Sequence, residues 1–461
     1  MPTNRTTETP VSGPPVPSSA RRAGPPPSPA LTLAAALLGF ALITLDASVV
    51  NVALPAIGSD LGSGMSGLQW VVDSYTLAFA ALMLSTGAFS DRAGASRAYA
   101  LGAGVFTLAS VACGLAPTLP VLIGSRVVQG AAAAVVLPAS LALVRQAYPD
   151  PVRRSRAVAL WAAGGSVAVA LGPVAGGALT TAWDWRGIFF VNVPLGAVAL
   201  ALLLRAPRSE RRPAPLDLPG QLTAVLALTA LTFAVIEGGR WGLLALGVAV
   251  ASAVAFVRVE ARRERPVVPL GLFRGRNVRV AVAAGAACSV GFYGVVFLFS
   301  LFFQQVQGRS ALYAGLMFLP MTGLIAVTNL AAGKLAGRYG PRRPMVIGQS
   351  LAAAGLLPLM CVDASTPTGL VAVLLVPVAL GCALTVPPLT AAMMDAVPPE
   401  RAGLAAGVLN SARQVAGGLA VAAFGSLVAG GFEAGLRTSL ALSALALAAT
   451  AAASTRLRPA R

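Results

Sequence analysis

Three acidic residues lie within or beside long apolar stretches of the sequence, where a charge is expensive. Asp46 stands in LITLDASVVNVALP, Asp73 in LQWVVDSYTLAF and Glu237 in VIEGGRWG. Removal from water favours the protonated form of a carboxyl group, so such a side chain can take up and release a proton, and a cation could compete for it. We therefore predict Asp46, Asp73 and Glu237 as candidate functional residues. A local hydrogen bond or a wet position at a helix end is the alternative for each.

Two arginines also fall inside apolar stretches. Arg126 lies in LIGSRVVQGAAAA and Arg413 in NSARQVAGG. An arginine in such surroundings is expected to face a cavity or a carboxylate, and for Arg126 the alternative is that it reaches water from near a helix end. For Arg413 a cavity and a neighbouring helix remain equally open.

Composition indicates the environment of these residues. The chain has 461 residues, of which 56% are hydrophobic and 11% charged, whereas soluble domains carry about 25% charged residues. Apolar runs of about 20 residues recur without alternation, which favours membrane-spanning helices over a barrel. We predict fourteen spans, at about 31–55, 67–89, 98–116, 119–143, 156–179, 188–204, 218–236, 241–257, 280–303, 311–333, 344–362, 369–394, 402–429 and 436–454.

Enzymatic and metal chemistry find little support in the sequence. The chain has no histidine, and its four cysteines have no metal-ligand spacing. No phosphate-binding loop or HExxH segment occurs, and the linkers between spans are too short for a catalytic domain. We expect no enzyme activity, no metal and no cofactor.

The net charge of +18 is arranged in alternate loops. With fourteen spans, both tails and every second loop lie on one side of the membrane. Most of the 34 Lys and Arg residues fall in these tails and loops. Positive residues mark cytoplasmic loops, so we expect both termini in the cytoplasm. The charge then faces lipid headgroups of the bilayer and needs no nucleic acid partner.

The two halves of the chain repeat each other. GAFSDRAGASRAYALG (87–102) resembles GKLAGRYGPRRPMVIG (333–348), about 250 residues later. Two similar halves joined by a linker form a transporter architecture with the substrate path between them. We predict a disordered cytoplasmic tail, an N-terminal six-helix half, linkers with two extra membrane helices, a C-terminal six-helix half and a second cytoplasmic tail, at residues 1–30, 31–204, 205–279, 280–455 and 456–461.

GAFSDRAGASR (87–97) is predicted to form a short loop after the second span. Gly87 and Gly94 permit tight turns. Asp91 can cap the next helix or meet its positive end, and Arg92 can pair across the loop. An ordinary charged turn is the alternative.

ALGPVAGGAL (170–179) closes the fifth span. Gly172, Gly176 and Gly177 allow close helix contact, and Pro173 is expected to kink the helix. Plain packing of small residues is the alternative.

Together these segments resemble the major facilitator superfamily, in its fourteen-helix drug:proton antiporter branch, over about residues 31–454. LDASVVNVALP is similar to the first-helix signature of that branch, GAFSDRAGASR to the superfamily's loop motif, RVVQG to its fourth-helix motif and GPVAGG to its fifth-helix antiporter motif. The pattern is similar to that of actinobacterial exporters of the methylenomycin-resistance type. Ala95 and Ser96 stand where the loop motif has basic residues, and Gly337 replaces the acid of the second copy. The gating contact is therefore expected to depend mostly on Asp91 and Arg92.

The resemblance implies an all-α polytopic membrane protein of the major facilitator fold, with two six-helix halves plus two extra linker helices. It implies a proton-coupled antiporter that exports a lipophilic drug or antibiotic across the bacterial cytoplasmic membrane by alternating access. Asp46 is then expected to couple transport to the proton, with Asp73 and Glu237 as further candidates. A proton-coupled importer or exporter of an endogenous metabolite is the alternative. We expect a monomer. Aromatic side chains could line a drug site, although core or lipid-facing positions suit them equally: Trp70, Tyr75, Phe292, Tyr293, Phe297 and Phe299.

Overall fold

The computed structural model describes residues 28–204, 209, 217–263, 266, 268–397 and 402–457. Most of the predicted N-terminal tail, the end of the predicted C-terminal tail and much of the first basic linker lie outside these residues. Pro29 and Ala30, which were predicted to belong to the tail, already form the first turn of a helix.

The described chain is helical nearly throughout, so the predicted all-α class is confirmed. The helices are α1 (Pro29–Asp60), α2 (Met65–Ala93), α3 (Ala95–Gly114), α4 (Leu119–Ala147), α5 (Pro151–Ala182), α6 (Gly187–Phe190), α7 (Asn192–Leu203), α8 (Leu218–Glu237), α9 (Gly239–Arg262), α10 (Arg276–Leu301), α11 (Ala311–Met317), α12 (Leu319–Gly323), α13 (Ile325–Tyr339), α14 (Arg342–Leu359), α15 (Thr368–Asp395), α16 (Ala402–Ala429) and α17 (Phe432–Ser454). Short turns η1 (Leu270–Arg274) and η2 (Phe302–Val306) precede and follow α10.

Eleven helical stretches of the described chain are long and apolar enough to cross a membrane. The count rises to twelve if the two arms of α2, which meet at an angle of 64° after Met83, form one span. The run Gly187–Leu203 is apolar but shorter, and α14 is not among the eleven. Every predicted span coincides with helical residues, although the span at 188–204 is divided between α6 and α7 and the span at 311–333 among α11, α12 and α13. The number fourteen stays a prediction.

Local sequence signals explain where several helices begin. Asp150 caps α5 by accepting a hydrogen bond from the Arg153 amide at 2.8 Å, and Asp217 caps α8 through the Gly220 amide at 3.0 Å. A proline stands in the first turn of both helices, where its missing N–H removes no helical bond. At about 1.5 Å per residue, the 32 residues of α1 are longer than the roughly 30 Å hydrocarbon core of a bilayer.

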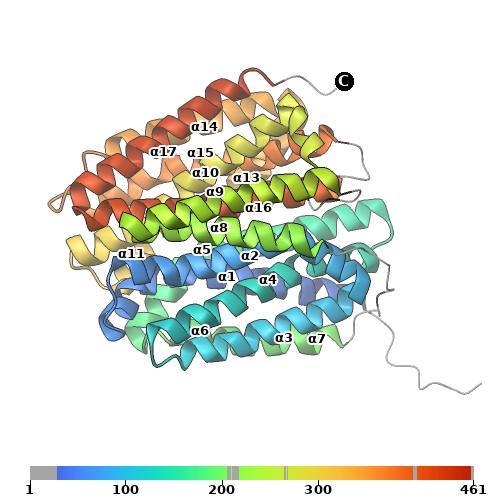
Figure 1. Ribbon diagram of the computed structural model, residues 1–461, viewed down its shortest axis with the longest axis horizontal. Helices are drawn as coiled ribbons and strands as arrows, with labels where there is room; N and C mark the ends of the chain where they lie inside the picture. The colour runs from blue at the N-terminus through green and yellow to red at the C-terminus, as the bar shows by residue number, and fades with distance from the viewer. Residues whose placement is uncertain are drawn as a thin grey trace, which may run out of the picture.

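Figure 1 shows two groups of helices. The N-terminal group (α1–α7) forms the lower part of the view and the C-terminal group (α10–α17) the upper part, while α8 and α9 cross the front. Helix α8 contacts both α2 and α16, one from each group. We call the end of the bundle where α1 ends the Asp60 end. The opposite end, where α2 and α17 end, is the Arg92 end.

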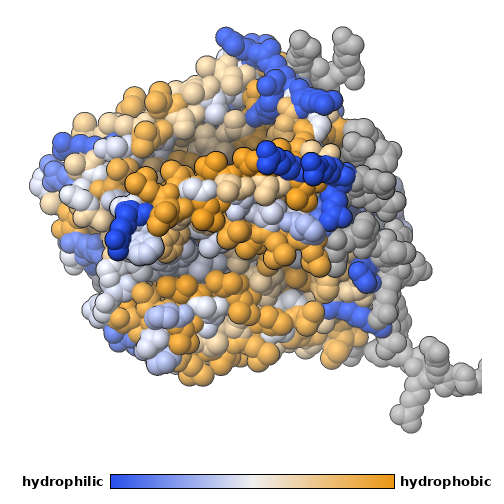
Figure 2. Space-filling view, viewed as in Figure 1, coloured by the Kyte–Doolittle hydropathy of each residue, from blue (hydrophilic) through white to orange (hydrophobic). Residues whose placement is uncertain are grey.

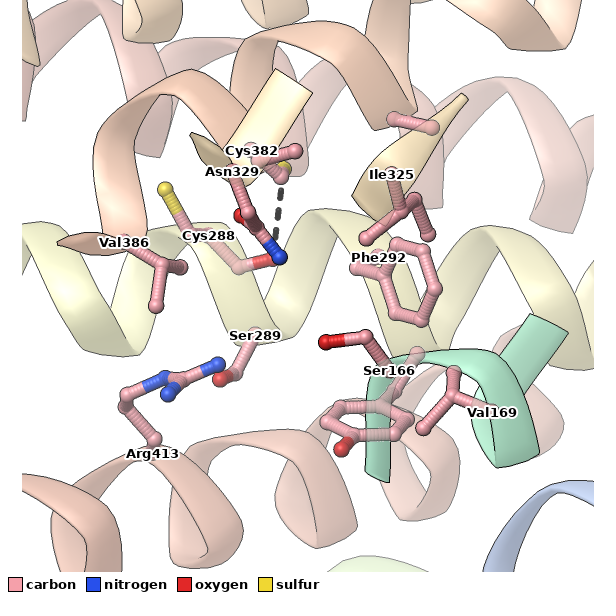
Figure 3. A pocket seen from close by; sticks show the side chains of 13 residues that line it. Ser166, Val169, Cys288, Ser289, Phe292, Ile325, Asn329, Cys382, Val386 and Arg413 are labelled. Carbon is pink, nitrogen blue, oxygen red and sulfur yellow. Dashed lines mark hydrogen bonds between the residues drawn. The ribbon is translucent and has the colours of Figure 1, made fainter. Parts of the chain in front are cut away.

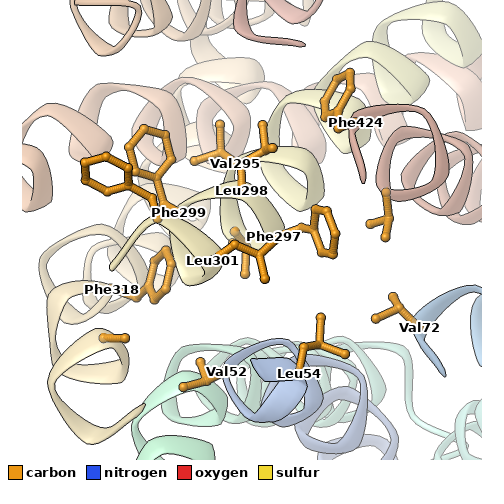
Figure 4. Packing of buried hydrophobic residues seen from close by; sticks show 14 of the residues in the cluster. Val52, Leu54, Val72, Val295, Phe297, Leu298, Phe299, Leu301, Phe318 and Phe424 are labelled. Carbon is orange, nitrogen blue, oxygen red and sulfur yellow. The ribbon is translucent and has the colours of Figure 1, made fainter. Parts of the chain in front are cut away.

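The largest buried apolar cluster joins the two groups. Val52, Leu54 and Val72 of the N-terminal group pack with side chains of α10, η2 and α16, among them Phe297 and Phe424 in Figure 4. Most of these residues belong to the halves of their helices nearer the Asp60 end. The two groups are therefore held together by apolar packing at that end.

Apolar side chains also cover the outside of the bundle. Figure 2 shows hydrophobic residues across the middle of the visible face and hydrophilic residues toward both ends. Exposed side chains of α8 and α9 contribute, such as Leu222 at 68% and Leu243 at 73% exposure. Such a surface suits a bilayer and would be costly in water.

Candidate functional site

Asp46 lies in a cluster of buried polar side chains in the N-terminal group. Its carboxylate forms an ion pair with the Arg126 guanidinium. It also accepts hydrogen bonds from the amide groups of Gln129, at 3.2 Å, and Asn192, at 2.7 Å. Helices α1, α4 and α7 each contribute to this Asp46 cluster, and both amides also donate to the hydroxyl of Ser110 in α3. None of the five residues of this cluster exposes more than 1% of its surface.

Arg126 is satisfied from several directions. Its Nε donates to the Val71 carbonyl at 3.2 Å, and its Nη1 donates to Gln129 at 3.0 Å as well as to Asp46. The guanidinium also lies over the Tyr75 ring, 4.2 Å from its centroid. A buried ion pair is tolerated when such further hydrogen bonds satisfy both partners. Arg126 therefore faces a carboxylate, one of the two settings expected for it.

Helix geometry builds the Asp46 cluster. Arg126 and Gln129 are three residues apart in α4 and so share one face. Close packing of α4 on α2 requires Gly130, because a Cβ there would clash with the backbone of Tyr75. The sequence reasoning missed Gln129, Asn192 and Ser110. The spacing to Arg126 could have pointed to Gln129, whereas Asn192 and Ser110 carry no comparable signal.

Asp73 has a different setting. Its side chain is fully buried, and neither carboxyl oxygen has a hydrogen-bond partner among the described residues. It lies where α2 meets α16 of the C-terminal group, and a Cβ at Gly418 would come 3.3 Å from one carboxyl oxygen. An ionised carboxylate without a partner is costly in such surroundings, and the neutral acid is much less so.

Glu237 ends α8 at the Asp60 end, and its side chain is exposed. Its carboxylate accepts hydrogen bonds from the Ser66 hydroxyl, at 2.9 Å, and the Trp70 indole, at 3.3 Å. These bonds tie α8 to the start of α2. Glu237 thus lies apart from the Asp46 cluster, and its contacts suit the positioning of α8.

The segment around Asp91 is helical for longer than expected. Helix α2 continues to Ala93, four residues beyond the predicted end of the span, so Gly87 lies inside it and the predicted loop shrinks to Gly94. Gly94 has φ 85° and serves as the turn into α3, a conformation that glycine adopts without strain. Asp91 and Arg92 are exposed, and neither pairs with another described residue.

The glycines of GPVAGG lie against two different helices. Added Cβ atoms at Gly172 and Gly176 would meet Ser48 and Val49 of α1, whereas one at Gly177 would meet Ala311 and Leu312 of α11. The Pro173 carbonyl in turn lies close to Gly315 of α11. The segment therefore packs α5 against its own group and against the other group.

Gly177→Leu is expected to prevent the two groups from closing at the Asp60 end, because its side chain would enter the backbone of α11. The measurement is the rate at which Val52→Cys, buried in the wild type, reacts with a water-soluble maleimide in purified protein that also carries Cys361→Ser. We expect Gly177→Leu to raise the rate at least about tenfold. Gly104→Leu is the control, since nothing lies within 4 Å of a Cβ there. Equal rates in both variants would contradict the packing role.

Polar contacts between the groups lie on the same side as the apolar cluster. The Ser300 hydroxyl donates to the Asn51 carbonyl at 2.7 Å, and the Gln304 amide donates to the Val52 carbonyl at 3.0 Å. Gln69, near the start of α2, donates to the Ala422 carbonyl of α16. These bonds close the Asp60 end.

A cavity lies between the groups on the other side of these contacts, toward the Arg92 end. It holds about 620 Å³ of empty space, part of it open to solvent. Figure 3 shows Ser166 of α5 facing Ser289 and Phe292 of α10 across it, with the Arg413 side chain pointing in from α16. The structure thus puts Arg413 at a cavity, and Phe292 and Tyr293 in its wall.

The sequence pattern of the Major Facilitator Superfamily matches residues 36–421. Multidrug resistance protein Stp of Mycobacterium tuberculosis is 39% identical over 418 residues, which cover 89% of this chain and 78% of Stp. The methylenomycin A resistance protein of Streptomyces coelicolor is 38% identical over 417 residues, covering 89% and 87% of the two chains. In fold, the chain is similar to a bacterial homolog of the human lysosomal transporter Spinster, with a TM-score of 0.68, 17% identity and coverage of 94% and 97%.

The chain therefore belongs to the Major Facilitator Superfamily. It is a multi-pass membrane transporter and not an enzyme. The resemblance drawn from LDASVVNVALP, RVVQG and GPVAGG is confirmed at the level of the family and of its drug-resistance relatives.

Proposed function

We propose that this protein exports a lipophilic drug or antibiotic from a bacterium in exchange for protons. The observation that carries the proposal is the buried carboxyl of Asp73 at the contact between α2 and α16, which has no hydrogen-bond partner among the described residues. These helices belong to different groups, so alternating access changes their contact. The names of the relatives, which include resistance to several antibiotics, support the substrate class.

Asp73 holds a proton in the conformation seen here, since charging it without a partner is costly. Separation of α2 and α16 at the Asp60 end would bring water to the carboxyl and allow it to exchange its proton. The charge state of Asp73 and the contact between the groups then depend on each other, which is the requirement for coupling two equilibria.

Asp46 acts as the second proton-dependent group in this proposal. Its charge is stabilised by Arg126 in the present conformation, and protonation would release Arg126 from the ion pair. Glu237 stays a predicted candidate, although its exposure and its bonds to α2 favour a positioning role.

The proposed architecture has fourteen spans: six in the N-terminal group, two formed by α8 and α9, and six in the C-terminal group. The Arg92 end faces the cytoplasm because the basic loops gather there, and both termini lie on that side. The conformation is then open inward, with the cavity reachable from the cytoplasm. The protein works as a monomer in the cytoplasmic membrane, and Asp91 and Arg92 belong to its cytoplasmic gate.

The test is expression in a bacterium that lacks its major efflux pumps, followed by growth on a panel of lipophilic antibiotics. We expect at least a fourfold rise in the inhibitory concentration of one or more compounds, and lower cellular accumulation that a protonophore abolishes. Unchanged susceptibility combined with proton-driven uptake of a metabolite would contradict drug export and favour the importer.

A further inference from the structure

The charge on the described side chains that line the cavity between the groups is positive only. Arg413 is the one charged side chain among the described residues that line it. No carboxylate of the described chain forms an ion pair with Arg413, and its Nε is buried without a hydrogen-bond partner. The Asp46 cluster and Asp73 do not line this cavity. A bound cation would therefore meet a positive charge without a compensating carboxylate.

Packing against neighbouring residues positions the Arg413 side chain. The aliphatic stem lies over Gly285 of α10, where an added Cβ would come 3.1 Å from the Arg413 Cγ. A Cβ at 285 would force the stem to shift by a few tenths of an ångström. The guanidinium extends past Gly285 toward Ser289 and the empty space (Figure 3).

Other polar groups converge on the same space. The Ser289 hydroxyl and the Asn329 amide oxygen are buried and have no hydrogen-bond partner in the described chain. The hydroxyl and the Asn329 amide nitrogen can donate, as can the five N–H groups of arginine. Apart from the hydroxyls of Ser166 and Tyr293, the rest of the wall is mostly apolar, with Phe292, Ile325 and Val169 among its residues.

We propose that this cavity binds amphiphilic anions, with Arg413 as the residue that selects them. The apolar body of the ligand lies against Phe292 and Ile325, and a carboxylate or a similar acidic oxygen group accepts charge-assisted hydrogen bonds from Arg413. The inference rests on the proposed export function and makes it more specific: the substrate is a lipophilic acid and not a lipophilic cation. It departs from the expectation that a cation competes with the coupling proton.

The test uses three ligands that differ only in their end group: 1-pyrenebutyrate, 1-pyrenebutanol and 1-pyrenebutylammonium. Saturable binding to purified full-length protein is measured in detergent at pH 7 without any gradient, with empty micelles as background. We expect the carboxylate to bind at least about tenfold more tightly than the alcohol, and the ammonium more weakly than the alcohol. Equal or reversed preference, or no saturable binding of any of the three, would overturn the proposal.

Variants assign the preference to Arg413. Arg413→Gln should remove the tenfold advantage of the carboxylate over the alcohol, while Arg413→Lys should keep part of it. Arg437→Gln, at an exposed arginine that pairs with Glu433 at 3.8 Å, is the control for a lost charge. A carboxylate preference that survives in folded Arg413→Gln would contradict the assignment. Arg413-dependent binding without pyrenebutyrate-driven proton movement in vesicles would instead count against coupled export and leave the anion site standing.

Discussion

Asp73→Asn is expected to abolish uphill drug efflux while leaving drug binding and passive exchange intact. Asparagine has nearly the shape of the neutral acid, so the contact between α2 and α16 beside Gly418 should persist. It cannot exchange a proton, so the gradient should no longer drive transport. In proteoliposomes we expect accumulation against a gradient to fall at least about a hundredfold, and exchange of labelled for unlabelled drug to stay within about threefold of wild type.

Asp395→Asn is the matched control, because Asp395 is an exposed acid at the end of α15. It should transport as the wild type does. If Asp73→Asn still accumulates drug against a gradient, Asp73 is not the coupling group and the proposed mechanism fails at its main step.

Asp46→Asn is expected to destabilise the protein as well as inactivate it. The change would leave the Arg126 guanidinium buried without its carboxylate, and breaking one side of a buried ion pair costs about 3–5 kcal/mol. We expect the midpoint of thermal unfolding in detergent to fall by at least about 5 °C. Loss of transport by Asp46→Asn can therefore result from the lower stability or from the loss of proton exchange at Asp46.

The double variant Asp46→Asn/Arg126→Gln separates them. It removes both charges and keeps groups that can hydrogen-bond, so most of the lost thermal stability should return. We expect transport to stay at least about fiftyfold below wild type, because proton exchange at Asp46 is part of the proposed cycle. A stable double variant that transports normally would show that the ion pair serves packing alone.

Arg126 shows which part of the candidate site could be predicted from the sequence. A charge in an apolar helix predicts that some partner exists, and the structure places Arg126 against Asp46. Which carboxylate pairs with Arg126 depends on how α1, α2 and α4 pack. From the sequence alone, Asp73 of α2 was as plausible a partner as Asp46. Asn192 and Ser110 could not be predicted, since single polar residues occur in many apolar helices without forming a cluster.

Helix ends were harder to predict than helix positions. Hydropathy detects where a helix leaves the apolar layer, and a helix such as α2 continues beyond that point to Ala93. Asp91 and Arg92 are exposed there, so neither charge is removed from water, and Arg92 in the last turn suits the negative end of the helix. Gly94 is then the single residue between α2 and α3.

Drug export in exchange for protons can be measured in inside-out vesicles with an acidic interior and a pH-sensitive dye. The compound with the largest effect on growth is added to vesicles that contain wild-type protein, Asp73→Asn or Asp395→Asn. We expect proton release from the vesicles on addition of the compound for wild type and Asp395→Asn, and none for Asp73→Asn. Uphill transport of the compound by the wild type without any proton movement would contradict export in exchange for protons.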